Sequence, residues 1–183
     1  MIKLYFATGN EGKLKEAQNI LGVDVEGVGL EIDEIQSMDP VEVAVKKARA
    51  YYSALKKPIF IEDVSVSIKA LYGLPGTYID AFMQSLGNEG IVELMKEKTN
   101  RKVLAQATVV YVEKAGSEKI FIGKVVGKVA DKPRGDGFGW DPIFIPKGEK
   151  RTFGEMSLEE KNKYSMRAKA LTKFKKWLDD KSK

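Results

Sequence analysis

Two neighbouring carboxylates, Glu62 and Asp63, directly follow the apolar run PIFI. On an extended chain, neighbouring side chains point to opposite faces, so one carboxylate can enter a cleft while the other is directed elsewhere. A carboxylate is a natural ligand for Mg²⁺ and a natural base for water, and Glu34 in an acidic turn could complete a metal site. The alternative is an exposed polar strand end, which fits Glu62 better than Asp63 because apolar Val64 follows Asp63.

The chemistry open to this chain is limited because it contains neither cysteine nor histidine. This composition excludes Ser-His-Asp catalysis, imidazole- or thiolate-bound metals, a cysteine nucleophile and a disulfide framework. Carboxylates, lysines, arginines and hydroxyls must therefore carry any reaction.

The segment ATGNEGK (7–13) follows a strand-like apolar run at the start of the chain. If a helix begins near Glu11, its free N–H groups and the positive end of its dipole would face an anion, with further donors from Thr8, Asn10 and Lys13. The spacing is too short for the common phosphate loop of NTPases, and no serine or threonine follows Lys13. The alternative is an ordinary strand-to-helix turn with Asn10 as the N-cap.

A glycine-rich segment, GDGFGWDP (135–142), contains two aromatic residues, Phe138 and Trp140. Its glycines allow the backbone to approach a flat group closely, and the two rings offer faces for stacking. Stacking of a base on an aromatic ring contributes about 1–3 kcal/mol but discriminates little between bases. The alternative is a bulged turn whose aromatic residues fill the core.

Ser157 and Glu160 have the spacing of a capping box, and we expect them to open a C-terminal helix that reaches about Asp180. Arg167 falls within the apolar stripe of this helix and Lys161 lies at its edge, so both could reach a ligand. The alternative is that Arg167 extends to solvent or pairs with an internal carboxylate. The apolar stripe consists of Tyr164, Ala168, Leu171, Phe174 and Leu178.

Apolar periodicity predicts an order of strands and helices along the 183 residues. Strands are expected at 2–8, 23–30, 57–63, 64–71, 102–114 and 118–129, with a last strand at the end of 134–146. Helices are expected at 13–22, at 40–55 behind an Asp39 cap, in two stretches up to about Lys98 broken between Gly87 and Gly90, and at the C-terminus. Helical crossings early in the chain and a hairpin later predict one α/β (α+β) domain, 1–183, with a central mixed sheet flanked by helices.

Lysine and arginine total 31 against 26 acidic residues, and the excess lies in the segment 147–183. A basic segment suits an anionic partner, either a phosphorylated small molecule or nucleic acid, or it forms a solubilising helix face. The sequence has no signal-peptide pattern and no apolar run of membrane-spanning length. We therefore expect a soluble cytoplasmic protein without a membrane partner.

In this order, the segments resemble the inosine triphosphate pyrophosphatase family over nearly the whole chain. The spaced TGN-x-x-K start and the FGWDP stretch are the specific parts of this resemblance. The matching segments are ATGNEGK (7–13), EIQ (34–36), IFIED (59–63), ALYGLPGTY (70–78), GFGWDPIF (137–144), FGEMSLEEKN (153–162) and SMR (165–167).

The resemblance implies an elongated α/β fold with two lobes and a ligand cleft between them, usually in a homodimer. It implies Mg²⁺-dependent hydrolysis of ITP, dITP and XTP to the nucleoside monophosphate and pyrophosphate, which removes deaminated purines from nucleotide pools. Nucleic acid is not an expected partner of such an enzyme.

The resemblance also implies roles for individual residues. Asp63 would bind Mg²⁺ and orient or deprotonate the attacking water, and Glu34 would help to hold the metal. Lys161 and Arg167 would read the purine, because a 6-oxo group accepts hydrogen bonds from cationic donors whereas a 6-amino group does not. The implied substrate-binding residues are Thr8, Gly9, Asn10, Glu11, Gly12, Lys13, Lys47, Val64, Phe138, Gly139, Trp140, Asp141, Lys161, Met166 and Arg167.

Two positions depart from the family pattern. Met166 stands where the family usually has a histidine that contacts the base, and Val64 stands where many members have a serine. Neither change touches Asp63 or the segment 7–13, so we expect hydrolysis to persist and base selectivity to be the property affected. Two alternatives follow: a pyrophosphatase with a different base preference, or a non-catalytic protein that binds nucleotides or nucleic acid.

Overall fold

The computed structural model describes residues 3–181, and these form two compact units built from alternating stretches of the chain. Unit 1 comprises Met1–Asp63, Ala107–Gly123 and Arg167–Lys183, and unit 2 comprises Val64–Gln106 and Lys124–Met166. The chain therefore passes from unit 1 to unit 2 immediately after Asp63 and returns immediately before Arg167.

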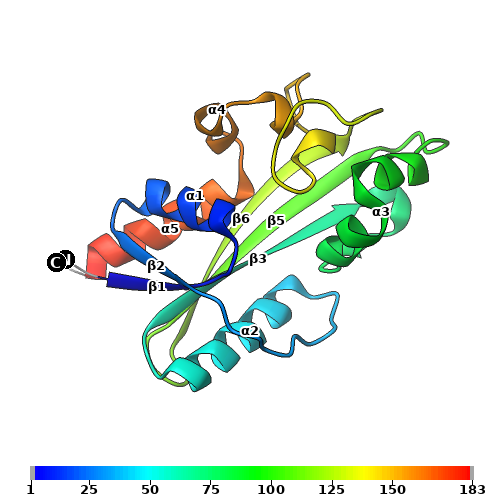
Figure 1. The fold of residues 1–183 in the computed structure, drawn as a ribbon. Helices are drawn as coiled ribbons and strands as arrows, with labels where there is room; N and C mark the ends of the chain where they lie inside the picture. Colours follow the sequence, from blue (N-terminus) through cyan, green and yellow to red (C-terminus); the bar gives the residue numbers. More distant parts are fainter. Residues whose placement is uncertain (1–2, 182–183) are drawn as a thin grey trace. The chain divides into compact units, whose positions relative to one another are not determined.

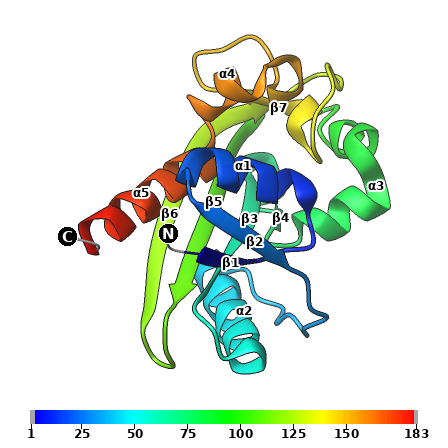
Figure 2. The same ribbon diagram turned by 60° about the vertical axis from the view of Figure 1, so that its left-hand side comes forward.

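Unit 1 is an α/β arrangement around parallel strands. Strand β1 (Lys3–Ala7) pairs in parallel with β2 (Asp24–Val28) and with β3 (Ile59–Ile68). Helix α1 (Glu11–Leu21) connects β1 to β2, and α2 (Pro40–Leu55) connects β2 to β3. Figures 1 and 2 show α2 on one face of these strands, with α1 and α5 (Met166–Lys181) on the other. The helical crossings predicted from the sequence are thus confirmed.

The two faces of β3 in unit 1 are packed by different helices because its side chains alternate. Phe60 faces α5, where its ring lies 5.2 Å from that of Phe174, and it also stacks on Phe6 at 4.4 Å. The neighbouring residues Ile59 and Ile61 point the other way, into a core cluster that includes Ala44 and other residues of α2. Every side chain on this part of β3 is therefore assigned to one of two environments.

The helices of unit 1 begin and end where local sequence signals place them. The Asn10 side chain accepts a hydrogen bond from the Lys13 N–H, so α1 begins at Glu11, and Gly22 ends α1 in the left-handed conformation with φ of 67°. Asp39 caps α2 by accepting from the N–H groups of Val41 and Glu42, and Pro40 occupies the first turn.

Unit 2 contains the remaining elements: β4 (Pro75–Gly76), α3 (Ile79–Leu94), β7 (Phe144–Pro146), α4 (Leu158–Asn162) and parts of β3, β5 (Lys102–Val112) and β6 (Glu118–Val129). It also holds three short 3-10 helices at Lys69–Leu71, Asp141–Ile143 and Phe153–Glu155. Strands β6 and β7 pair antiparallel, as do β3 and β4. One seven-stranded mixed sheet results, with the order β2-β1-β3-β5-β6-β7 and β4 paired to β3, which confirms the predicted fold class.

The structure corrects the predicted bounds of one strand region and one helical region. The expected strands 57–63 and 64–71 are one strand, β3, which carries Glu62 and Asp63 in its interior. The α3 region ends at Leu94 rather than near Lys98, whereas the predicted break is confirmed at Gly87, where φ is 63°. Within residues 3–181, no helix has the length and apolar character to cross a membrane.

The expected single C-terminal helix is two helices. Ser157 and Glu160 do form a capping box, but their helix, α4, ends at Asn162. The N–H groups of Lys163 and Tyr164 donate to carbonyls three residues back, which tightens the chain into a turn, and α5 begins at Met166. Apolar spacing did not reveal this break because Tyr164 and Ala168 keep helical spacing across it.

We expect two glycine substitutions in the loop before β7 to differ sharply in cost. Gly135 and Gly139 both have positive φ, 70° and 61°, but a Cβ on Gly135 would overlap the backbone of Gly154 whereas one on Gly139 meets no atom within 4 Å. Gly139→Ala should lower the free energy of unfolding by about 1 kcal/mol, the strain of the left-handed conformation. Gly135→Ala should cost about 1–3 kcal/mol more because of the overlap. Urea unfolding of both variants measures the difference, and equal losses would contradict this packing.

Candidate functional site

The segment 7–13 forms a tight turn between β1 and α1 in unit 1. The Thr8 hydroxyl accepts from the Asn10 N–H at 3.1 Å, and the Asn10 side chain accepts from the Lys13 N–H at 3.0 Å. The predicted helix start at Glu11 and the alternative reading of Asn10 as an N-cap are both confirmed. Because a capped α1 still presents the positive end of its dipole here, the cap is compatible with anion binding.

A buried charge network lies on the α1/α5 side of β3, around Glu62. The Arg167 Nε donates to Glu62 Oε1 at 3.0 Å, and its Nη1 donates to Glu16 Oε2 at 2.6 Å. Lys13 Nζ lies 3.2 Å from Glu62 Oε2. Glu62 and Arg167 are only 3% and 4% exposed, so each charge depends on the others for compensation.

This network fixes the ionisation of Glu62. Burial alone would raise the pKa of this carboxyl, but Arg167 and then Lys13 outweigh that effect and hold the pKa at about 2. The reading of Glu62 as an exposed strand end is therefore wrong. The alternative reading of Arg167, pairing with internal carboxylates, is confirmed.

A second charge cluster lies on the α2 side of β3, around Asp63. Lys47 of α2 places its Nζ 2.5 Å from Glu34 Oε1 and 4.0 Å from Asp63 Oδ2. Burial raises the pKa of Asp63, with Lys47 and Lys13 opposing the shift. The pKa of Lys47 is raised: its burial acts against this, but Asp63 and Glu34 outweigh it. The structure thus brings together Glu34 and Asp63, the two carboxylates predicted to hold a metal, and it places Lys47 between them.

The donors of this second cluster suit a hard cation. No group of three or more acidic side chains is placed to hold a metal ion within residues 3–181. However, Mg²⁺ is commonly held by one or two carboxylates together with phosphate oxygens of a substrate. Glu34 and Asp63 supply two carboxylates that already converge on a positive charge, so they fit such an ion.

In unit 2, the glycine-rich segment before β7 holds its two aromatic rings in different environments. Phe138 is 49% exposed, so its ring face is available for stacking. Trp140 packs edge-on against Phe144 with ring centroids 5.3 Å apart, and it lies near Phe153. The stacking role thus remains open to Phe138, whereas Trp140 follows the core-filling alternative.

Buried Asp141 anchors this segment from within unit 2. Its Oδ2 accepts from the Phe138 N–H at 3.1 Å and from Lys161 Nζ at 2.7 Å. Both Asp141 and Lys161 are buried, so the lysine ammonium is held beside the aromatic segment. Met166 is also buried in unit 2, and Val64 is partly exposed.

Sequence reasoning missed two residues that hold these clusters together. Glu16 bonds Arg167 and follows Lys13 by one turn of α1, a spacing that could have suggested a shared face. Asn88 follows the Gly87 break in α3, and its Nδ2 donates to the Gly139 carbonyl at 3.0 Å. The predicted break at Gly87 was the only local sign that a side chain there makes a distant contact.

Comparisons with protein families, curated proteins and solved structures all match this chain to one family. The model of the Ham1 family matches residues 4–177 of this chain. The sequence is 44% identical to the dITP/XTP pyrophosphatase of Methanopyrus kandleri over 96% of both chains. It is 40% identical to the inosine triphosphate pyrophosphatase of Aspergillus fumigatus over 98% of this chain and 96% of the other. A solved HAM1 protein from Coxiella burnetii has a similar structure, with a TM-score of 0.87, 26% identity, and coverage of 98% of this chain and all of that one.

The network around Glu62 makes a pH-dependent prediction for Arg167→Leu. This change leaves the Glu62 and Glu16 charges buried with fewer partners, so it should lower the free energy of unfolding by about 3–5 kcal/mol at pH 7. In the wild type, the depressed pKa of Glu62 contributes stability above its ordinary value of 4.5, and this contribution is lost as the pH falls towards 2. The loss caused by Arg167→Leu should therefore shrink between pH 7 and pH 3, with most of the change below pH 4.5, as measured by urea unfolding.

The matched control for this prediction is Arg151→Leu. Arg151 pairs with Glu160 at 3.0 Å, but both side chains lie at the surface. We expect this variant to unfold almost like the wild type at both pH values. Equal unfolding curves for the two arginine variants at pH 7 would refute a buried network around Glu62.

Proposed function

Because the chain belongs to the Ham1 family, we propose that it hydrolyses the non-standard purine nucleoside triphosphates ITP, dITP and XTP to the nucleoside monophosphate and pyrophosphate. Relatives at 44% and 40% identity carry the names dITP/XTP pyrophosphatase and inosine triphosphate pyrophosphatase, and they match over almost their full lengths. Such a reaction cleanses nucleotide pools of deaminated purines.

The observation that best supports this proposal is the environment of Asp63. Its carboxyl is held beside Lys47, and burial raises its pKa, which makes the carboxylate a stronger base. Asp63 would orient the attacking water and accept its proton as the bond between the α- and β-phosphates breaks. Lys13 and the N-terminal end of α1 would offset the charge of the phosphates.

We assign Mg²⁺ to Glu34 and Asp63, whose carboxylates fit it. When bound, the ion would neutralise charge that develops on the phosphate oxygens. Lys47 would keep the two carboxylates together between turnovers, because it contacts both. We also include a cytoplasmic homodimer in the proposal, in which the dimer rests on the resemblance noted from the sequence.

The resemblance noted from the sequence assigns base selection to Phe138, Lys161 and Arg167. Phe138 would stack on the purine, and Lys161 would donate to its 6-oxo group. The resemblance also assigns Arg167 to the base, and in the structure its Nε and Nη1 donate to Glu62 and Glu16. A buried donor without an acceptor costs about 1–3 kcal/mol, which is the penalty that adenine would incur.

The proposed function is tested by measuring pyrophosphate release from ITP, XTP, GTP and ATP, each with Mg²⁺ and with a chelator. We expect Mg²⁺-dependent release, with ITP and XTP favoured over ATP by about 5–150-fold, because an unpaired donor costs about 1–3 kcal/mol. Equal rates on all four substrates would support hydrolysis and point to Met166 as the reason for lost selectivity. A lack of release from every substrate would refute the proposal.

Substitutions of the two neighbouring carboxylates on β3 should affect different properties, activity in one case and stability in the other. Asp63→Asn removes the proposed base and should lower pyrophosphate release from ITP by about a hundredfold or more while the protein remains folded. Glu62→Gln removes a partner of Arg167 and should mainly lower the free energy of unfolding, by about 1–3 kcal/mol. Rate measurements and urea unfolding on both variants separate the two roles. Undiminished turnover in Asp63→Asn would contradict the role assigned to this carboxylate.

A further inference from the structure

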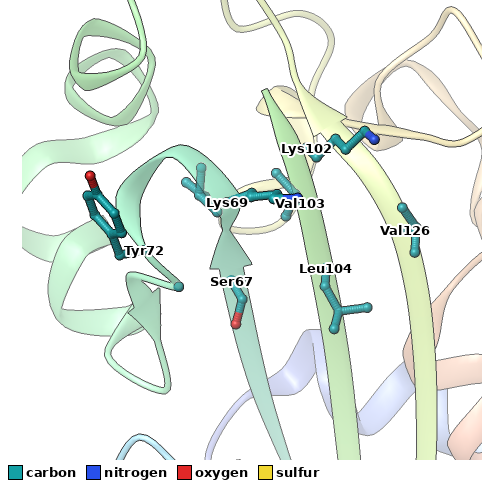
Figure 3. A pocket seen from close by; sticks show the side chains of 9 residues that line it. Ser67, Lys69, Tyr72, Lys102, Val103, Leu104 and Val126 are labelled. Carbon is teal, nitrogen blue, oxygen red and sulfur yellow. The ribbon is translucent and has the colours of Figure 1, made fainter. Parts of the chain in front are cut away.

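One face of the unit 2 sheet carries exposed side chains that no step of nucleotide hydrolysis uses. Leu104 of β5 and Val126 of β6 lie beside each other on this face, with Lys102 at the start of β5 (Figure 3). A hollow of about 430 Å³ opens here, and Lys69 and Tyr72 also line it. Its floor is apolar and part of its border is cationic.

This hollow continues along the sheet as a basic groove. Lys102 and Val126 also line a second hollow of about 450 Å³, which extends to Lys128 and Lys147. A third hollow of about 290 Å³ shares Lys128 and Ile145 with the second. The cationic residues along the whole groove are Lys69, Lys102, Lys128, Lys132, Arg134, Lys147 and Lys150.

Within the part of the chain that the structure describes, the lysines of the basic groove lack neutralising partners. The Val129 N–H donates to the Arg101 carbonyl at 3.0 Å, which places Lys102 and Lys128 side by side on adjacent strands. Like charges in this position destabilise a sheet. None of the six lysines of the groove pairs with a carboxylate among residues 3–181. An anionic ligand would relieve this repulsion.

The two carboxylates along the groove are already engaged. Asp131 Oδ1 lies 3.4 Å from Arg101 Nε. Glu149 accepts a hydrogen bond from the Tyr164 hydroxyl at 2.6 Å and also lies near Arg151. The groove therefore presents a net positive charge to any ligand that enters it.

An exposed aromatic ring stands at one end of the groove. Tyr72 is 98% exposed and holds the left-handed conformation, with φ of 55°, which a side chain other than glycine rarely adopts. We propose that the basic groove binds single-stranded nucleic acid, with the lysines contacting successive phosphates and Tyr72 stacking on a base. Proteins that bind single strands combine a row of cations along the backbone with aromatic rings on which the bases stack. An acidic peptide would match the charge, but its side chains have no flat ring to stack on Tyr72.

The binding test uses the full chain with fluorescein-labelled dT20 and rU20 in fluorescence polarisation between 50 and 300 mM NaCl. Lys102→Gln/Lys128→Gln should weaken binding about tenfold at 50 mM and make the slope of log affinity against log salt shallower by about 1.4. Tyr72→Ala should weaken binding by about 5–150-fold without changing that slope. The probe that binds with the higher affinity, dT20 or rU20, shows whether DNA or RNA is preferred.

The matched control is Lys119→Gln/Lys176→Gln, which removes the same net charge from two exposed lysines of unit 1. It should bind like the wild type, and no variant should melt at a lower temperature than the wild type, since Lys102→Gln/Lys128→Gln removes two like charges that face each other. Binding that is absent at 50 mM NaCl, unaffected by Lys102→Gln/Lys128→Gln, or matched by polyglutamate would overturn the proposal. Light scattering that shows Lys102→Gln/Lys128→Gln converting a dimer into a monomer, without strand binding by the wild type, would also overturn it and identify the face as an interface between copies.

Discussion

The alternation of side chains along β3 is the constraint on which the unit 1 site depends. It sends Glu62 towards α1 and α5 and Asp63 towards α2, although the two residues are adjacent. Two carboxylates with the same chemistry therefore acquire opposite pKa shifts. Glu62 is locked as an anion by Arg167, while Asp63 keeps a raised pKa beside Lys47. One strand thus separates a charge that holds the fold together from the carboxylate that we propose as the base.

The features predicted correctly from the sequence are those set by local chemistry. The Asn10 and Asp39 caps depend on residues within one helical turn, so their signals are complete in a short window. The long hairpin of β5 and β6 follows from alternating residues on either side of a short turn. The opposite orientation of Glu62 and Asp63 also follows from strand periodicity alone, once a strand is assumed.

The features missed depend on contacts between distant segments. Glu62 was read as exposed because no sequence pattern shows that Arg167, 105 residues later, bonds to it. Glu16 and Arg167 are 151 residues apart, and their pairing appears only when α1 and α5 cover the same strands. The break before α5 was missed for a different reason, since a tight turn of i→i−3 bonds hardly disturbs apolar spacing.

The position of Lys13 has a consequence for the cost of binding. Its side chain is 17% exposed and its ammonium lies against Glu62, so this long side chain is ordered before any ligand arrives. Immobilising a free lysine on binding costs about 0.5–1.5 kcal/mol of conformational entropy. Folding has already ordered Lys13, and a triphosphate that meets it exchanges one anionic partner for another. The network that stabilises the fold thereby pre-organises the residue proposed to receive the phosphates.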